Sequence, residues 1–147
     1  RTDLAALVAS VVEEYEDMGE PVMLGETTRI ALPIRATWLR RALLNLIGNA
    51  VRYGGEAQVS LLREGEEAVI RIADKGPGIP PAELSAMLEP FTRGEASRNR
   101  ETGGAGLGLT LARAIAEQHG GQLVLANRVG AGGVVEGLVA EIRLGAG

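Results

Sequence analysis

The sequence predicts an α+β fold, a two-layer sandwich in which three main helices cover one face of a mixed, mostly antiparallel sheet of about five strands. Segments with apolar residues at helical spacing are interspersed with segments in which apolar and polar residues alternate. Glycine and proline separate these segments, and 147 residues are enough for one hydrophobic core but not for two. We therefore expect the chain to form a single domain.

The expected elements follow from this periodicity. Helices are expected at residues 3–17, 37–53 and 106–119, with a shorter one at residues 81–88 that begins with proline. Strands are expected near residues 27–34, where Pro33 ends the segment, and at residues 121–129 and 134–144. Residues 57–74 predict a hairpin with its turn at 64–66, and residues 90–105 predict a long loop.

Composition excludes several classes of protein. The formal net charge of −4 argues against a nucleic-acid partner. The absence of cysteine excludes disulfides and thiolate metal sites. No apolar run approaches the roughly 18 residues of a membrane-spanning helix. The chain begins at Arg1 rather than methionine and has no signal-peptide pattern, so we expect it to come from a longer protein.

A cluster of glycines precedes the last predicted helix. The stretch "ETGGAGLGLT", residues 101–110, has four glycines, and each one costs conformational entropy when it is ordered. Glycines at a helix N-terminus let the backbone approach a phosphate, which the free N–H groups and the helix dipole both favour. Because glycines also form ordinary loops, this motif alone is weak evidence for nucleotide binding.

The predicted helix at 37–53 has a polar stripe. At about 100° per residue, Asn45 and Asn49 lie about 40° apart and Arg52 lies beside Asn45, with Gly48 along the edge. Amide oxygens suit Mg²⁺ and guanidinium suits phosphate, so the stripe predicts a site for a metal and the phosphates that it bridges. The alternative is a polar face exposed to solvent. The other face is expected to be buried: Leu39, Leu43, Leu46, Ile47, Ala50 and Val51.

Asp74 ends a predicted strand. It alternates with Ile70 and Ile72, so its side chain should point into the same apolar layer, where a carboxylate needs a partner. Gly76 and Gly78 follow and leave space for a flat ligand, and the amino group of a purine would be a suitable donor. The alternative is an ordinary strand end.

Four stretches in this order resemble a known family. "NLIGNAVRY", "DKGPGIP", "EPFTRGE" and "GGAGLGL" are similar to the N, G1, F and G2 boxes of the sensor histidine kinase catalytic and ATP-binding domain. That domain belongs to the GHKL superfamily with gyrase B, Hsp90 and MutL. The resemblance covers residues 20–145 and implies the Bergerat ATP-binding fold. It also implies that the chain binds Mg²⁺ and ATP and transfers the γ-phosphate to a histidine on a separate dimerisation domain.

The resemblance implies a role for each matching residue of the first two boxes. Asn49 would coordinate Mg²⁺, and Asn45 would lie close to the metal and phosphates, where it would act in catalysis. Arg52 would contact the phosphates, and Tyr53 would lie against the adenine. Asp74 would accept a hydrogen bond from the adenine amino group.

The remaining boxes complete the implied site. Gly76 and Gly78 would shape the adenine pocket, and Ile79 would line it. In the F box, Phe91 would contact the nucleotide and Arg93 would act in catalysis, beside an ATP lid at residues 81–105. Four residues would cradle the phosphates: Gly104, Gly106, Leu107 and Gly108.

Two positions differ from relatives in the family or superfamily. Ala105 stands where the family often has Thr or Ser, which removes one hydroxyl contact but keeps the backbone cradle. Asn45 stands where gyrase- and Hsp90-type members have a glutamate that acts on water. An amide cannot be a general base, so the chain is expected to transfer the phosphate rather than hydrolyse ATP.

The resemblance also implies partners outside this chain. The phosphorylated histidine would belong to a dimerisation domain of the same kinase, connected through residues 1–17, and the signal would pass to a response regulator. The domain would be cytoplasmic, as part of a membrane-bound bacterial sensor. His119 lies at a predicted helix end before Gly120, where a cation suits the dipole, and is interpreted as structural.

Three alternatives come from other functional classes. A dinucleotide-binding oxidoreductase would need its glycines directly after a strand, but "SRNRET" precedes them here. Another GHKL module, an ATPase or a serine kinase, would keep the fold and change the reaction. A non-catalytic nucleotide-binding scaffold is the third alternative, and the complete set of boxes argues against it.

Overall fold

The computed structural model describes residues 2–76 and 105–145 and has one main sheet. Its strands are β2 (Val22–Leu24), β4 (Ala57–Glu64), β5 (Glu67–Ala73), β6 (Gln122–Val129) and β7 (Val135–Gly145), in the spatial order β2-β4-β5-β7-β6. The β2–β4 pair is parallel and the other pairs are antiparallel. A short 3-10 turn, Ala131–Gly133, joins β6 to β7. The α+β fold predicted from the sequence is confirmed.

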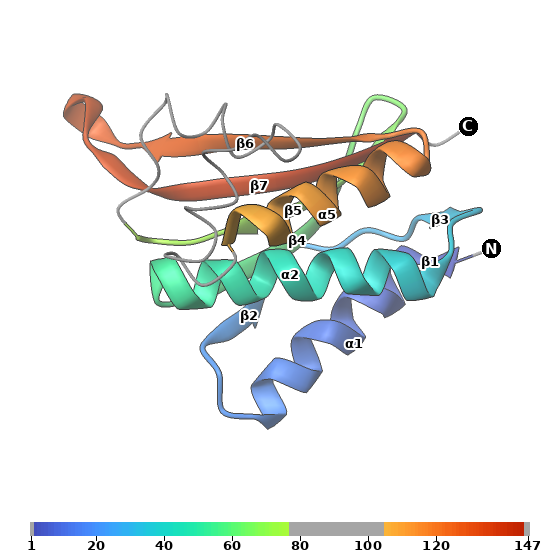
Figure 1. Ribbon diagram of the computed structural model, residues 1–147, viewed down its shortest axis with the longest axis horizontal. Coiled ribbons are helices and arrows are strands. Elements are labelled where there is room, and N and C mark those ends of the chain that lie inside the picture. The colour runs from blue at the N-terminus through green and yellow to red at the C-terminus, as the bar shows by residue number, and fades with distance from the viewer. Residues whose placement is uncertain (1, 77–104, 146–147) are drawn as a thin grey trace.

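Three helices lie on one side of the sheet: α1 (Leu4–Asp17), α2 (Ala36–Gly54) and α5 (Ala105–Gln118) (Figure 1). Buried aliphatic side chains fill the space between the two layers, among them Leu43 and Ile47 of α2 and Ile70 and Ile142 of the sheet. None of the helices in the described ranges is long and apolar enough to cross a membrane.

The helix α2 forms as its apolar pattern predicts. Its apolar face is buried as expected, except that Val51 is only partly buried. The helix ends because Gly55 adopts a left-handed conformation with φ of 80°, and its N–H donates to the carbonyl of Val51. A residue with a β-carbon would be strained there, so Gly55 determines where α2 stops.

The strand expected at residues 27–34 is largely wrong. Only Ala31–Leu32 (β3) form a strand, and they pair with Thr2–Asp3 (β1) in a separate two-stranded sheet. The edge strand β2 lies earlier and was not predicted, because Val22 alone among its three residues is buried. Such a short segment has no alternation to detect. The expected helix at residues 81–88 lies outside the described residues.

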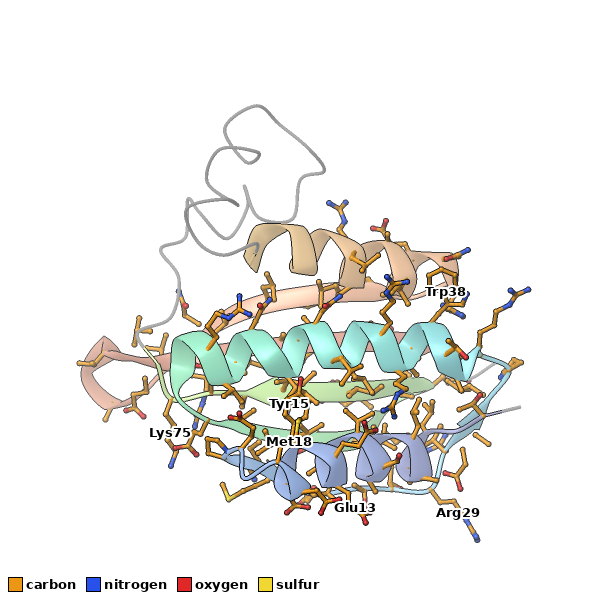
Figure 2. The ribbon with its side chains drawn as sticks, turned by 60° about the horizontal axis from the view of Figure 1, so that its bottom comes forward. Glu13, Tyr15, Met18, Arg29, Trp38 and Lys75 are labelled. Atoms are coloured by element: carbon orange, nitrogen blue, oxygen red, sulfur yellow. The ribbon has the colours of Figure 1, made fainter. Side chains whose placement is uncertain are left out.

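The helix α1, expected as a connection, contributes to the core of this domain. Leu4, Val8, Val11 and Val12 are all buried. Figure 2 shows Tyr15 between α1 and α2, where its hydroxyl donates to the carbonyl of Leu44 at 3.2 Å. Whether α1 also connects to a further domain stays a prediction.

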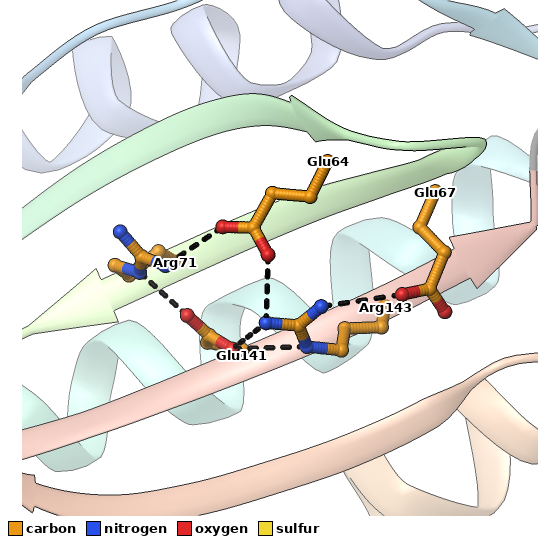
Figure 3. A network of polar contacts seen from close by, with 5 residues as sticks. All are labelled: Glu64, Glu67, Arg71, Glu141 and Arg143. Atoms are coloured by element: carbon orange, nitrogen blue, oxygen red, sulfur yellow. Dashed lines mark hydrogen bonds and ion pairs between the residues drawn. The ribbon is translucent and has the colours of Figure 1, made fainter.

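The other face of the sheet has a network of charged side chains (Figure 3). Glu141 of β7, which is 8% exposed, accepts from Arg71 at 2.5 Å and from Arg143 at 2.9 Å and 3.1 Å. Glu64 and Glu67 also pair with these arginines. Because both oxygens of Glu141 are paired, the sheet tolerates a buried carboxylate on this face.

Candidate nucleotide-binding site

Three elements meet at one end of the molecule. Figure 1 shows that the C-terminal end of α2, the N-terminal end of α5 and the end of β5 lie at the same end, since α2 and α5 run in opposite directions. The sequence-predicted residues of the N box, the G1 box and the G2 box belong to these three ends. The fold therefore brings together motifs that are about 25 to 60 residues apart in the sequence.

The side chain of Asn49 has a buried amide nitrogen without a partner among the described residues. Asn45 and Asn49 are half-buried on α2 and Arg52 is exposed, so the stripe lies at the border between core and solvent. The Nδ2 of Asn49 is buried and has no hydrogen-bond partner among the described residues. Leaving a buried donor unpaired costs about 1–3 kcal/mol. The site therefore lacks an acceptor that a ligand could supply.

Gly48, along the edge of the polar stripe, lies on the side of α2 near Tyr15. A β-carbon at this position would be in ordinary contact with the hydroxyl of Tyr15, at 3.6 Å. This edge of α2 therefore faces α1.

Asp74 is buried, as the strand alternation predicts, with 5% of its surface exposed. Its Oδ1 accepts from the backbone N–H of Gly76 at 2.9 Å and from that of Leu138 at 3.0 Å. Its Oδ2 makes no hydrogen bond within the described part of the chain. Two amides thus fix the carboxylate, and one oxygen is left to accept from a ligand.

Glycines that sequence analysis missed make room for Asp74. A β-carbon on Gly54, in the last turn of α2, would overlap the carboxyl group of Asp74. A β-carbon on Gly137 of β7 would overlap the backbone carbonyl of Asp74. Neither glycine belongs to the four boxes, and no local pattern distinguishes them from turn glycines.

The first turn of α5 contains part of the predicted phosphate cradle. Ala105, Gly106, Leu107 and Gly108 are helical, so Ala105, expected as the last residue of the lid, instead begins the helix. The first N–H groups of a helix have no intrahelical acceptor and favour an anion. This N-terminus is at the same end of the molecule as the C-terminal end of α2 and the end of β5 (Figure 1).

Several predicted site residues cannot be compared with the structure. Gly78, Ile79, Phe91, Arg93 and Gly104 lie outside the described residues, as do residues 81–104 of the expected lid. Tyr53 lies in the last turn of α2, and its side chain is not described. These roles stay predictions.

Both ring nitrogens of His119 have structural partners. Nδ1 lies 2.8 Å from the carbonyl of Ile115, which can only accept, so Nδ1 donates. Nε2 accepts from the backbone N–H of Arg35, the N-cap of α2, at 3.4 Å. Gly120 follows with φ of 79°. His119 therefore joins the end of α5 to the start of α2, in agreement with its structural interpretation.

Comparison with known proteins identifies the family. A family model described as "Histidine kinase-, DNA gyrase B-, and HSP90-like ATPase" matches residues 34–143, which contain α2, the hairpin, α5 and nearly all of the last strand. The chain belongs to this family.

Sensor histidine kinases are among the proteins similar to this chain. The sensor histidine kinase GtrS of Pseudomonas aeruginosa is 36% identical over 126 residues, which are 86% of this chain and 26% of GtrS. The chain thus spans about a quarter of the length of that relative. These matches confirm a histidine kinase catalytic and ATP-binding domain of the GHKL superfamily.

Solved structures of histidine kinases have a similar fold. The mycobacterial sensor histidine kinase MprB has a TM-score of 0.77 and 26% identity, covering 98% of this chain and 95% of that one. The ATP binding domain of PrrB from Mycobacterium tuberculosis has a TM-score of 0.77 and 25% identity, covering 99% and 96%.

The described residues fit the nucleotide that this family binds. Among these residues, one carboxylate oxygen of Asp74 and the buried amide nitrogen of Asn49 have no hydrogen-bond partner. Within residues 2–76 and 105–145, no group of three or more acidic or histidine side chains could hold a metal ion. Among the described residues, the side-chain oxygen of Asn49 is a candidate metal ligand that could act together with oxygens of a nucleotide.

Proposed function

We propose that this chain binds ATP with Mg²⁺ and transfers the γ-phosphate to a histidine on a separate dimerisation domain of a two-component sensor kinase. The observation that carries the proposal is the state of Asp74, which is buried, fixed through Oδ1 by two backbone amides, and without a partner at Oδ2 among the described residues. Such a group recognises a donor in a fixed direction, as the amino group of adenine requires.

Adenine recognition would follow from this geometry. A purine amino group would donate to Oδ2 of Asp74 and satisfy the remaining acceptor of the carboxylate. Guanine presents a carbonyl oxygen at the corresponding position, and two acceptors facing each other repel. The site would therefore prefer adenine to guanine, while the amides of Gly76 and Leu138 keep the carboxylate from rotating.

The phosphates would extend toward α2 and α5. The amide of Asn49 would present its oxygen to Mg²⁺ and its nitrogen to a phosphate oxygen, which would satisfy the buried donor. Arg52 and the first N–H groups of α5 would neutralise phosphate charge. Mg²⁺ would supply charge neutralisation and alignment of the phosphates.

Asn45 favours transfer over hydrolysis. It lies one turn before Asn49 on the same helix, and its amide could orient a phosphate but could not remove a proton from water. Phosphoryl transfer depends mainly on positioning and charge neutralisation, so an incoming imidazole would need no strong base here. Arg93 and the rest of the F box would complete the site from the lid.

The acceptor histidine would come from another domain. His119 already uses Nδ1 and Nε2 in hydrogen bonds to the backbone. The proposed partners are a dimerisation domain of the same kinase, attached through α1, and a response regulator. A cytoplasmic location within a membrane-bound sensor is part of the same proposal.

A labelling experiment tests the proposed reaction. The chain is incubated with γ-labelled ATP and Mg²⁺, alone and with the dimerisation domain of its own parent kinase. We expect no self-labelling, little hydrolysis, and label on a histidine of the added domain. A variant of that domain with its histidine replaced by glutamine is the control. Rapid hydrolysis without an acceptor would favour the ATPase alternative, and label on His119 would contradict the division between two domains.

A further inference from the structure

We infer that Arg128 is a positioning residue for Asp74 and thereby contributes to the adenine preference of the site. This inference rests on the proposed function. Arg128 lies on β6, two strands away from β5, and one of its guanidinium nitrogens donates to the backbone carbonyl of Asp74 at 2.8 Å. The four boxes do not include Arg128.

The register of the sheet explains how Arg128 reaches Asp74. In the order β5-β7-β6, Arg128 pairs with Gly137 of β7, which therefore separates it from the end of β5. Gly137 has no side chain, and a β-carbon there would overlap the carbonyl that Arg128 contacts. The guanidinium can therefore cross β7 at this position. A larger residue at 137 would block the contact and displace Asp74 as well.

Asp74 is held by hydrogen bonds at three points. Its N–H donates to the carbonyl of Leu138 at 3.0 Å, and its Oδ1 accepts from the N–H of Leu138 at 3.0 Å. Its carbonyl accepts from Arg128, the only donor to this carbonyl among the described residues. Because Asp74 comes directly after the last residue of β5, the regular ladder does not hold its carbonyl. Arg128 supplies that restraint, with a charged donor that makes a strong hydrogen bond.

Arg128 acts from the face of the sheet opposite the helices. It lines a groove of about 510 Å³ on that face, together with Arg71 and Glu141. Arg71 is engaged there by Glu141 and Glu64, whereas Arg128 has no carboxylate partner in the described part of the chain. Its position therefore depends on its contact with Asp74, and the two residues should move together.

Three variants test this inference. Arg128→Met removes the donor and keeps much of the side-chain length, while Arg128→Lys keeps a charged donor. Arg63→Met is the control, because the Arg63 side chain is exposed on the same sheet and makes no hydrogen bond or ion pair with described residues. Affinities for ATP and GTP are measured by titration calorimetry. Amide hydrogen exchange of Leu138 and Gly76 is measured without nucleotide, with the Ile142 amide in the middle of β7 as the internal reference.

We expect Arg128→Met to reduce the preference for ATP over GTP by about tenfold, since the carboxylate would lose its fixed orientation. We also expect the Leu138 and Gly76 amides to exchange faster in this variant than in the parent, while the exchange rate of the Ile142 amide stays the same. Arg128→Lys should recover part of both effects, and Arg63→Met should change neither.

The two readouts distinguish failure of this inference from failure of the proposed function. If the parent chain prefers ATP and Arg128→Met keeps both the preference and the exchange rates, Arg128 does not position Asp74. Faster exchange with unchanged nucleotide preference would overturn the link to specificity, and a changed preference without faster exchange would overturn the route through Asp74. If the parent does not bind ATP, the proposed function fails, and the exchange rates alone decide whether Arg128 holds Asp74.

Discussion

Gly54 and Asp74 lie so close together that position 54, at the end of α2, has no room for a side chain. A β-carbon on Gly54 would come within 2.7 Å of Oδ1 of Asp74 and closer still to its Cβ and Cγ. The helix that carries Asn49 and the strand end that carries Asp74 are therefore in direct contact. The two halves of the candidate site depend on each other through this contact.

Gly54→Ala should test that contact. We expect the variant to lose about 1–3 kcal/mol of unfolding free energy, because the added methyl group forces Asp74 or α2 to shift. The affinity of the folded variant for ATP should also fall, in addition to any loss of binding that comes from unfolded molecules. Denaturant unfolding and nucleotide titration measure the two effects.

Gly48→Ala is the matched control within the same helix. Its new β-carbon would be 3.6 Å from the Tyr15 hydroxyl, an ordinary contact, and alanine favours helix over glycine by about 1 kcal/mol. This variant should be at least as stable as the parent. Equal stability for the two alanine variants would argue against a tight contact between Gly54 and Asp74.

Asp74→Asn should change nucleotide selectivity with little effect on the fold. The amide oxygen can take the place of Oδ1 and accept from Gly76 and Leu138, which leaves the NH₂ group in the place of Oδ2. Two donors would then face each other when adenine binds. We expect ATP affinity to fall about tenfold or more, and GTP affinity to fall less or to rise. Unchanged affinity and selectivity would refute the role given to Asp74.

Asn49→Ala should separate stability from function. The substitution removes a buried amide nitrogen that has no partner, and alanine is the better helix former. The nucleotide-free variant should therefore be as stable as the parent, or more stable by up to about 1 kcal/mol. The increase in ATP affinity that Mg²⁺ produces should become smaller. If Mg²⁺ enhances binding equally in parent and variant, Asn49 is not the metal ligand.

Tyr15→Phe should change the alkaline stability of the domain. Burial, and then the charges of Glu20 and Glu14, raise the pKa of the Tyr15 hydroxyl above 10.0. The folded state thus favours the protonated phenol, and this contribution to stability is present below pH 10 and is lost as the pH rises through the higher folded-state pKa.

The phenylalanine variant should lose the hydrogen bond to Leu44, worth about 1 kcal/mol at neutral pH. Above pH 10.0 its stability should fall less steeply than that of the parent. Denaturant unfolding across this range measures the difference. Identical slopes in parent and variant would show that Tyr15 does not contribute to the alkaline loss.

The sequence by itself determined the helices and strands whose apolar pattern is formed by residues close together along the chain. The apolar face of α2 repeats from Leu39 to Val51, and the alternation of Ile70, Ile72 and Asp74 places the carboxylate in the core, so both were predictable. Four glycine- and asparagine-bearing boxes identified the family. Each of these signals depends on neighbours within a few residues along the chain.

Only the tertiary structure decided which residues support Asp74. Gly54, Arg128 and Gly137 come from three different elements and reach Asp74 through strand order and helix packing. The three-residue strand β2 was likewise undetectable, because its place in the sheet depends on pairing with β4. Periodicity reports which face of an element is apolar, but the distance between two elements depends on how their side chains pack, and a glycine or an arginine has no local pattern that reveals its distant partner.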